Sequence, residues 1–380
     1  MRPSVSYVFP TSHKFRVPFH ERLREELDAR GIDYKYIYSE NDTNDGKGDV
    51  QAPLGAISVP LITWRWGRRR ISFQRAMAAT KNDDLVILQQ QNNLLGNYPI
   101  LLSRRVQGKK VALFGHGKNF QSSSPNGLAE TFKRWWSRRV DWWFAYTVEC
   151  ARVVQHMGFP ADKITVFNNA IDVSSISAEM ASLSKEHLSK RRDADFHGSQ
   201  NIGVYVGSLY AGKRIQLLLD SADKIREAIP DFHLIVIGGG PETALVERAA
   251  LSRPWLHYVG PKFGLAKTEL VALGDVVLMP GAVGLVVLDA FAYGLPLVTT
   301  RSAKHGPEIA YLVDGENGVI VENDTDYPAA VVHLLKNSDE RMRLAENAAS
   351  CLQIYNIENM AKAFCNGILA ALSHDGKTHD

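Results

Sequence analysis

Residues 278–300, LMPGAVGLVVLDAFAYGLPLVTT, restrict the fold more than any other part of the chain. An apolar run ends near Gly281, and a turn at Gly284 leads into apolar residues at helical spacing. Gly294 ends that helix, and residues 297–300 read as the next strand. The stretch predicts a strand, a glycine turn, a helix and a second strand. In that arrangement helix amides and the positive end of the helix dipole face an anion such as phosphate.

The same stretch resembles the nucleotide-sugar signature of family-four retaining glycosyltransferases, commonly Glu-Gly-Phe-Gly-Leu-x-x-x-Glu-Ala-x-Ala-x-Gly-x-Pro. The second glutamate of the signature is Asp289 here, and the first is Gly281, which has no side chain. In the family the second acid usually holds the ribose and the first contacts the sugar. The resemblance implies a donor nucleotide pocket with Asp289 on the ribose diol. The positions that match as they stand are Gly284, Leu285, Ala290, Ala292, Gly294 and Pro296.

Strand and helix patterns alternate in both halves of the 380 residues, and 45% apolar and 22% charged residues are ordinary for globular domains. Such alternation predicts parallel sheets covered on both faces. The resemblance implies the α/β GT-B fold, two Rossmann-like domains facing a central cleft. The predicted division is an N-terminal acceptor-binding domain at 1–175, a linker at 176–200, a C-terminal nucleotide-sugar-binding domain at 201–343, and at 344–380 a C-terminal helix that crosses back to the first domain.

Residues 207–214, GSLYAGKR, follow the first strand of the second domain. The family usually shows Gly-Arg-Leu-x-x-x-Lys here, with both cations on the donor diphosphate. Lys213 matches, Ser208 stands in place of the arginine, and Arg214 is the candidate for the second charge. A departing diphosphate gains negative charge in the transition state, which fixed cations and helix amides stabilise. Lys213 and Arg214 are therefore predicted as catalytic groups; the alternative is a solvated Lys-Arg pair at a helix start.

Further turns of the second domain complete the predicted donor site. Residues 238–240 are three glycines between a strand and a helix, but the third glycine of a dinucleotide motif falls on Thr243, which disfavours a dehydrogenase. The alternative for these glycines is a tight turn, and for residues 305–308, HGPE, it is helix capping. The donor-binding candidates are Gly207, Ser208, Lys213, Gly260, Pro261, Gly281, Gly284, Leu285, Val286 and Asp289, with Glu308, Gly239 and Gly240 as further candidates.

His116 is the predicted catalytic residue of the first domain. Residues 115–118, GHGK, come directly after a strand, at the carboxyl end where α/β sites gather. Glycines on either side allow a ligand to approach the backbone closely. A histidine at a similar strand end lies at the sugar in many members of the family. The alternative is a loop histidine that makes a structural hydrogen bond.

The net charge of +3 conceals an asymmetry, because residues 1–178 hold 25 basic and 16 acidic residues while the remainder holds 19 and 25. Residues 64–70 and 132–139 interleave tryptophan with arginine, which indicates an anionic membrane surface as a partner, a solvated helix face being the alternative for the second cluster. Three widely spaced cysteines indicate a reducing compartment. No apolar stretch is long enough to span a bilayer. We therefore expect a cytoplasmic location, with peripheral attachment to the inner face of the cell membrane.

These observations predict a metal-independent glycosyltransferase, with no cofactor besides its nucleoside-diphosphate-sugar substrate. It would move a sugar, with retention as the resemblance implies, to a hydroxyl of a lipid-linked or cell-surface glycan, as in lipopolysaccharide or capsule biosynthesis. Two alternatives remain open: a nucleotide-sugar epimerase of the same fold, and a basic-aromatic nucleic-acid-binding protein. The second leaves the Asp289 stretch without a purpose, so nucleic acid is not expected as a partner.

Overall fold

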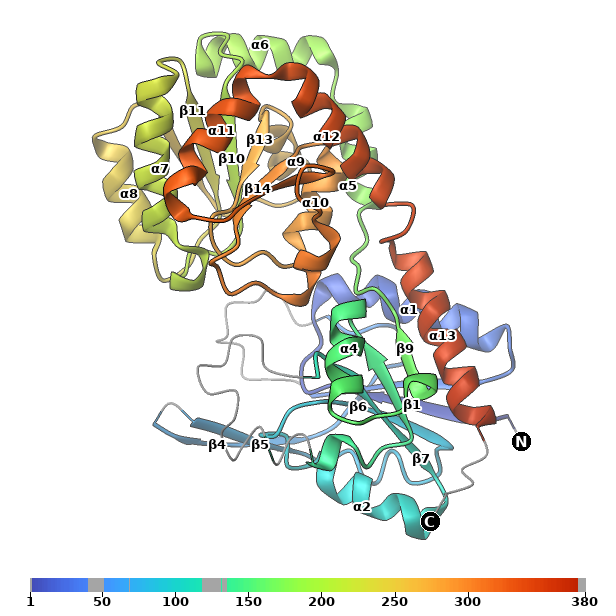
Figure 1. Cartoon of the computed structure of the whole chain (residues 1–380). Coiled ribbons are helices and arrows are strands. Elements are labelled where there is room, and N and C mark those ends of the chain that lie inside the picture. Colours follow the sequence, from blue (N-terminus) through green and yellow to red (C-terminus); the bar gives the residue numbers. More distant parts are fainter. Residues whose placement is uncertain (1, 40–50, 68, 118–130, 132–134, 375–380) are drawn as a thin grey trace. The chain divides into compact units, whose positions relative to one another are not determined.

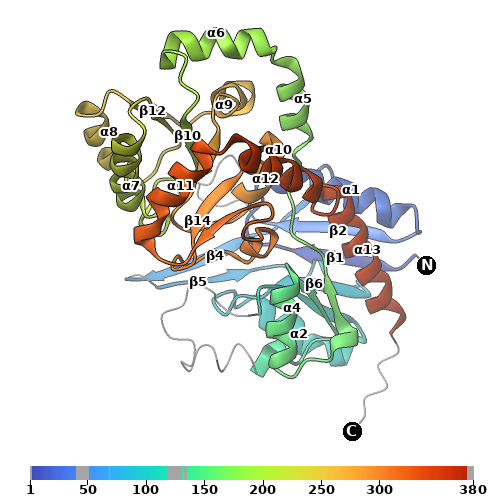
Figure 2. The ribbon, with the colours of Figure 1, turned by 45° about the horizontal axis from the view of Figure 1, so that its top comes forward.

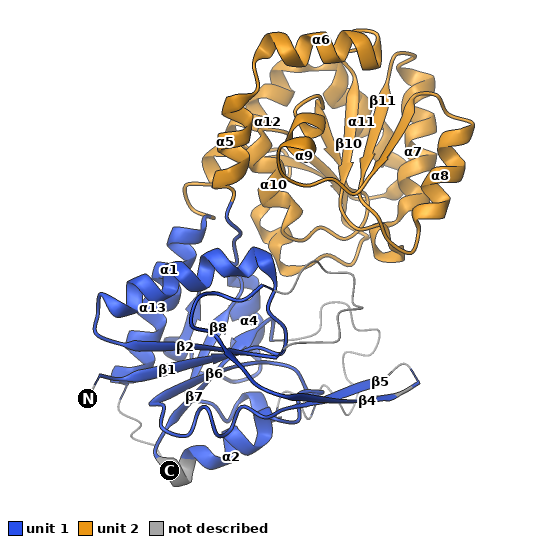
Figure 3. Ribbon diagram, turned by 180° about the vertical axis from the view of Figure 1, so that it is seen from behind, with its two compact units in different colours: residues 1–172, 356–380 blue, residues 173–355 orange. Residues whose placement is uncertain are grey.

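The computed structural model of the chain describes residues 2–39, 51–67, 69–117, 131 and 135–374. These residues divide into two compact units, residues 1–172 with 356–380 and residues 173–355 (Figure 3). Each unit is built around a parallel β-sheet of its own. The predicted α/β class with two Rossmann-like domains is therefore confirmed.

In the described part of unit 1, seven parallel strands lie in the order β3-β2-β1-β6-β7-β8-β9 (Figure 1). Residues 85–88 and 142–145 are buried at every position, because a parallel sheet is covered on both faces. The strands are β1 (Ser4–Val8), β2 (Asp33–Tyr38), β3 (Ile57–Ser58), β6 (Leu85–Gln89), β7 (Lys110–Gly115), β8 (Trp142–Ala145) and β9 (Ile164–Val166). The helices are α1 (Val17–Asp28), α2 (Asn97–Gln107), α4 (Val148–His156) and α13 (Ile357–Ser373), with 3-10 turns η1 (Lys14–Arg16) and η2 (Ala161–Lys163).

Helix α13 ends the described chain and packs on α1 and the sheet of unit 1 (Figure 1). The ring of Phe364 stacks on Phe144, with ring centroids 4.1 Å apart. Gly367 permits this approach, since a Cβ there would lie 2.5 Å from the hydroxyl oxygen of Thr165. Lys110 Nζ donates to three carbonyl oxygens at the end of α13, which satisfies groups that a helix terminus leaves without partners. The predicted return of the C-terminal helix to the first domain is thus observed.

A two-stranded antiparallel hairpin, β4 (Leu61–Trp66) and β5 (Arg69–Gln74), lies outside the main sheet of unit 1 (Figure 1). Because neighbouring side chains of a strand alternate between faces, the cross-strand pair Trp64 and Ile71 shares one face with Ile62. These side chains are 54%, 42% and 37% exposed. The hairpin was not expected from the sequence, and it carries most of the basic-aromatic cluster at residues 64–70.

In unit 2, six parallel strands lie in the order β12-β11-β10-β13-β14-β15. The strands are β10 (Ile202–Val206), β11 (His233–Ile237), β12 (Leu256–Gly260), β13 (Val276–Leu278), β14 (Leu297–Thr300) and β15 (Gly318–Val321). The helices are α5 (Ser174–Ser182), α6 (Lys185–Phe196), α7 (Ile215–Ala228), α8 (Thr243–Leu251), α9 (Gly264–Val271), α10 (Val286–Tyr293), α11 (Tyr327–Lys336) and α12 (Ser338–Cys351). The 3-10 turns are η3 (Ala211–Lys213), η4 (Pro307–Tyr311) and η5 (Asp324–Asp326). The predicted sequence 278–300 of strand, turn, helix and strand is observed as β13, α10 and β14.

The predicted division of the chain differs from the observed one at two places. Residues 176–200 are not a free linker: they form α5 and α6, which belong to unit 2, and α5 lies against α9 and α10 (Figure 2). Ile176 and Phe196 are buried in the core that the strands of unit 2 share. The return to unit 1 occurs at residue 356 rather than 344, because α12 packs on α10 and stays in unit 2.

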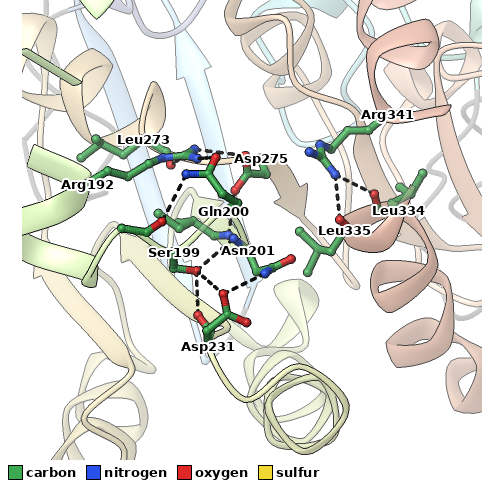
Figure 4. Close-up of polar contacts among 12 residues, drawn as sticks. Arg192, Ser199, Gln200, Asn201, Asp231, Leu273, Asp275, Leu334, Leu335 and Arg341 are labelled. Carbon is green, nitrogen blue, oxygen red and sulfur yellow. Dashed lines mark hydrogen bonds and ion pairs between the residues drawn. The ribbon is translucent and has the colours of Figure 1, made fainter. Parts of the chain in front are cut away.

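Polar contacts of Arg192 attach α6 to the sheet at the end opposite the carboxyl edge (Figure 4). Arg192 Nη2 donates to the carbonyl oxygen of Leu273 at 2.7 Å and to Asp275 Oδ1 at 3.0 Å. The other carboxylate oxygen of Asp275 accepts from the amide of Ile202, the first residue of β10, at 2.8 Å. Burial raises the pKa of Asp275, and the charge of Arg192 opposes that rise. Both side chains are largely buried, so the contact fixes the segment that the sequence made look like a linker.

We predict that Arg192→Met lowers the free energy of unfolding by about 3 kcal/mol at pH 8, because it leaves the buried Asp275 carboxylate without its cation. Loss of the cation raises the pKa of Asp275 further, so the folded state then favours the protonated acid. The loss of stability should consequently be smaller at pH 5 than at pH 8. Urea unfolding at both pH values measures it. Lys190→Met on the same helix, where the lysine pairs with Glu186 in solvent, is the control and should have little effect. Equal stability of the two variants would contradict the account.

Candidate functional site

The predicted donor-site residues gather at the carboxyl edge of the unit 2 sheet. Connections leave this edge after each of the six strands, because parallel strands present their carboxyl ends on one side. The predicted residues lie in these connections or in the first turns that follow: Gly207, Ser208, Lys213 and Arg214 after β10, Gly239 and Gly240 after β11, Gly260 and Pro261 at the end of β12, Gly281, Gly284, Leu285, Val286 and Asp289 after β13, and Glu308 after β14. The fold thus brings them to one edge.

Close approach between neighbouring connections explains several of the glycines. A Cβ at Gly238 would lie 1.8 Å from the carbonyl oxygen of Gly207, and one at Gly240 would lie 2.4 Å from that of Leu209. The φ angles of Gly238 and Gly240 are 148° and 157°, a region that residues with a side chain rarely adopt. A Cβ at Gly239 would meet the ring of Pro261 at 3.0 Å. The glycines after β11 therefore serve tight packing of the connections; their contact with a donor stays a prediction.

Gly281 is packed against the turn that carries Lys213. A Cβ at this position would lie 2.2 Å from the carbonyl carbon of Lys213, and the amide of Ala282 donates to the carbonyl oxygen of Gly212 at 2.8 Å. No side chain fits at position 281 unless that turn moves. The missing first acid of the family signature has a steric cause in this chain, since η3 occupies the space that it would need.

The amine of Lys213 is mostly buried and donates to the carbonyl oxygen of Ala282 at 2.5 Å. Burial lowers its pKa to about 8. Within the described residues no carboxylate lies within ion-pair distance of this amine. A buried cation without a counterion is costly in the empty protein and is well suited to an anionic ligand.

Hydrogen bonds from three other segments fix residues 280–283. The hydroxyl of Thr300 donates to the carbonyl oxygen of Pro280 at 2.9 Å. Nε2 of His305 lies 2.7 Å from the carbonyl oxygen of Thr300, so this nitrogen carries the proton, and Nδ1 accepts from the amide of Val283 at 3.1 Å. Burial lowers the pKa of His305, in keeping with a neutral ring. Sequence reasoning did not assign His305 to the site; only its place beside Glu308 hinted at it.

The backbone amides at the start of α10 are available to an anionic ligand. For the backbone N–H groups of Gly284, Leu285 and Val286 no acceptor is found among the residues that the structure describes. A Cβ at Gly284 would meet nothing within 4 Å, so the space beside this turn is open. Free amides and the helix dipole favour an anion here. With the nearby amine of Lys213, whose acceptor Ala282 lies two residues before Gly284, they form a place for a diphosphate.

Asp289, in the first turn of α10, forms a pair with Lys267 from α9. Asp289 Oδ2 and Lys267 Nζ are 3.5 Å apart, and each side chain is about one-fifth exposed (21% for Lys267 and 20% for Asp289). Burial raises the pKa of Asp289, and Lys267 opposes that rise. Lys267 Nζ also lies 5.8 Å from the ring centroid of Tyr293. Lys267 was missed in the sequence, because nothing in α9 reveals which residue of α10 it faces.

Arg214 does not lie free for phosphate in this structure. Its guanidinium forms a two-point pair with Asp324, in which Nη1 lies 2.9 Å from Oδ1 and Nη2 contacts Oδ2, and Nη1 also donates to Ser302 at 2.8 Å. Its backbone is left-handed, with a φ of 58°, at the start of α7. The charge assigned to a second phosphate contact is thus already paired with a carboxylate. A catalytic role for Arg214 stays a prediction, and it would require the guanidinium to bind phosphate beside or in place of Asp324.

Glu308 is 6% exposed and lies in η4. A Cβ at Gly306 would be 2.8 Å from its Oε2, and the amide of Gly306 donates to the carbonyl oxygen of Val283 at 2.8 Å. The carboxylate is therefore near the turn that precedes α10. A contact with the donor stays a prediction for Glu308, as it does for Ser208, Gly260 and Pro261.

In unit 1, His116 follows β7 at the carboxyl edge of the sheet. Its ring meets that of Tyr146 edge to face, with centroids 4.4 Å apart. Gly117 has a φ of 75°, and a Cβ there would lie 2.9 Å from Val153, so this turn requires glycine. The histidine is thus held at the edge where the sequence placed it, and its catalytic role stays a prediction.

No three His, Cys, Asp or Glu side chains of the described residues converge as a metal ion would require. No described helix combines the length and apolar character needed to cross a bilayer.

Comparison with known proteins gives a family match within unit 2. Residues 200–337 match the family model described as Glycosyl transferases group 1. The chain is 32% identical over 177 residues to D-inositol 3-phosphate glycosyltransferase of Corynebacterium urealyticum, covering 42% of this chain and 40% of the relative. It is 23% identical over 197 residues to alpha-monoglucosyldiacylglycerol synthase of Acholeplasma laidlawii, covering 50% of this chain and 47% of the relative. The chain thus spans less than half the length of these curated relatives.

The fold resemblance extends over both units. The crystal structure of the Anabaena protein HepE in complex with UDP aligns with a TM-score of 0.70 at 12% identity, covering 97% of this chain and 100% of that one. At that identity the likeness shows a shared fold, which is GT-B. Residues 200–337, which carry the signature at 281–296 and the site at the edge of unit 2, thus match the group 1 glycosyl transferases.

Proposed function

We propose that this protein transfers a sugar from a nucleoside-diphosphate sugar to a hydroxyl of a glycan or lipid-linked acceptor, with retention of the anomeric configuration. One observation carries the proposal: the Lys213 amine is largely buried, has no carboxylate partner in the described part of the chain, and lies close to the open amides that begin α10. A diphosphate supplies the charge that both features lack. Asp289 then accepts hydrogen bonds from the ribose diol, about one helical turn further on.

The chemistry follows from this placement. Breaking the bond between the anomeric carbon and the diphosphate oxygen leaves extra negative charge on the diphosphate. Lys213 and the amides of α10 stabilise that charge more strongly in the transition state than in the bound donor, because they are fixed and shielded from water. The acceptor oxygen bonds to the same face of the anomeric carbon, and its proton passes to the departing diphosphate. This route needs no enzyme nucleophile, and His116 is the candidate to orient the acceptor hydroxyl.

The relatives support the donor more directly than the acceptor. HepE is seen in complex with UDP, and the names of the two curated relatives include D-inositol 3-phosphate and monoglucosyldiacylglycerol. Their matches cover at most half of this chain, and the family model lies wholly within unit 2. These names thus favour a donor of the nucleoside-diphosphate-sugar class and an acceptor that is a lipid or a glycan.

Attachment to the inner face of the cell membrane is part of the proposal. Trp64, Ile71 and Ile62 share one exposed face of the β4–β5 hairpin, and the neighbouring cross-strand pair Arg65 and Arg70 belongs to its other face. Tryptophan favours the membrane interface, and arginine favours anionic lipid. Of the second cluster, Trp135 is 54% exposed and lies against Arg139, 3.8 Å from its guanidinium carbon, whereas residues 132–134 lie outside the described residues. The hairpin is therefore the stronger candidate for the membrane contact.

We predict that Lys213→Met lowers turnover at saturating donor by about a hundredfold, as loss of a fixed transition-state charge does. The apo variant should be at least as stable as the wild type at pH 7, because the buried ammonium is costly. This cost is complete below pH 8, the folded pKa, and disappears as pH rises through the unfolded value near 10.5. Kinetics and thermal melting measure the two effects. Unchanged turnover in a folded variant would contradict the proposal. Consumption of the donor by the wild type in the absence of an acceptor would favour an epimerase.

Asp289→Ala should weaken binding of the nucleoside diphosphate by about 1–3 kcal/mol, because the ribose hydroxyls lose their acceptor. A 2′,3′-dideoxy nucleotide supplies the matched control: it should bind the wild type and the variant with similar affinity. Calorimetry with both ligands measures the coupling directly. If the variant loses the same affinity for both nucleotides, Asp289 does not hold the ribose.

The membrane contact predicts a pattern in vesicle flotation. The wild type should bind vesicles containing phosphatidylglycerol, should not bind phosphatidylcholine alone, and should dissociate as salt rises. Replacing Trp64 and Ile71 by serine should abolish binding, and Arg65→Glu with Arg70→Glu should weaken it by roughly 1 kcal/mol per removed cation or more. Leu102→Ser, at another residue that is 77% exposed, is the control. If vesicle binding is insensitive to salt and to the hairpin substitutions, the membrane contact is contradicted and a soluble acceptor is favoured. Salt-sensitive binding to single-stranded oligonucleotide instead would favour nucleic acid.

A further inference from the structure

A second cation without a carboxylate partner lies at the carboxyl edge of unit 1. Arg16 ends η1, in the connection between β1 and α1. Its Nη1 donates to Oδ1 of Asn169, which follows β9, at 2.5 Å. In the described part of the chain no carboxylate is within ion-pair distance of its guanidinium, and no acceptor is found there for Nε or Nη2. One nitrogen thus orients the group, and the others remain for a ligand.

Aromatic rings surround the guanidinium. Its central carbon is 5.2 Å from the ring centroid of Phe15 and 6.0 Å from that of Tyr146. Rings hold a guanidinium in place without neutralising it, since the interaction leaves the charge intact. Burial lowers the pKa of the neighbouring His20, and the charge of Arg16 lowers it further. The region is therefore electropositive at a fixed point.

The candidate acceptor residue lies against the same ring. His116 meets Tyr146 edge to face at 4.4 Å, so Arg16 and His116 both lie near the ring of Tyr146. Gln90 is 6% exposed, and its Oε1 has no hydrogen-bond partner among the described residues. This oxygen would lie 3.2 Å from a Cβ at Gly115, next to His116. A cation, an imidazole and an open buried acceptor thus occupy one small part of the edge.

We propose that Arg16 binds a phosphate group carried by the acceptor, while the polyol or sugar part of that acceptor lies at Tyr146 and His116. The inference rests on the proposed function and specifies the acceptor as a phosphate ester. Nε and Nη2 of a guanidinium match two phosphate oxygens as parallel donors. A hydroxyl group of the acceptor donates to the amide oxygen of Gln90. The excess of 25 basic over 16 acidic residues in residues 1–178 attracts such an acceptor from solution or from a lipid surface.

The test compares glycerol 3-phosphate and phosphatidylglycerol micelles, which carry the same phosphate as a soluble ester and as a lipid, with glycerol as the uncharged control. In calorimetry, Arg16→Gln should bind the phosphate ester at least about tenfold more weakly than the wild type. Arg22→Gln, an exposed arginine on α1 that pairs with Glu25, should bind like the wild type. Nucleoside diphosphate should bind all three proteins equally, because that site is built from residues of unit 2.

Protection of the wild type gives a second readout that needs no variant. Phenylglyoxal modification of Arg16, followed by peptide mass spectrometry, should be slowed by a phosphate ester and not by glycerol, and the source that protects identifies a soluble or a lipid acceptor. The inference is overturned if neither phosphate source protects Arg16, if Arg16→Gln binds both as the wild type does, or if that variant loses nucleoside diphosphate. If the wild type binds no nucleoside diphosphate while a phosphate ester still protects Arg16, only the proposed function is rejected.

Discussion

Burial of the Lys213 amine, without a counterion among the described residues, is the constraint on which the proposed donor site depends. The turn at residues 211–213 lies against Gly281 so closely that no side chain fits there. The carbonyl oxygen of Ala282 receives one of its hydrogen bonds, and residues 280–283 are held in turn by Thr300, His305 and Gly306. A site prepared in this way needs little rearrangement when charge develops.

The same packing explains where the sequence of this chain departs from the family signature. The first acid of the signature is absent because η3 occupies its space, and the second acid is shortened to Asp289 but gains Lys267 as a neighbour. Arg214, one residue beyond Lys213, is turned by its left-handed backbone toward Asp324. In the proposed site a single cation therefore offers most of the positive charge to a diphosphate, with helix amides rather than a second arginine beside it.

Local patterns predicted what depends on local sequence. The strand, turn and helix at 278–300 follow from periodicity and glycine placement, whereas the position of Lys213 and the return of the C-terminal helix were implied by the resemblance to the family. Contacts between segments distant in sequence could not be predicted: His305 reaches Val283 and Lys267 reaches Asp289 only because neighbouring strands end at one edge. Residues 176–200 read as a linker because they are polar, yet the buried Ile176 and Phe196 and the pair of Arg192 with Asp275 hold them to unit 2. The β4–β5 hairpin was missed since its arginines conceal the alternation of a strand.

Proton uptake on nucleotide binding tests the central claim most directly. With a pKa of about 8, roughly half of the Lys213 amines are uncharged at pH 8, and a bound diphosphate should restore the ammonium. Calorimetry at pH 8 in two buffers of different ionisation enthalpy, with whichever of UDP, GDP or ADP binds best, measures the protons exchanged. The account predicts uptake of about half a proton per nucleotide in the wild type and none in Lys213→Met. Tight binding by the wild type with no proton uptake would contradict it.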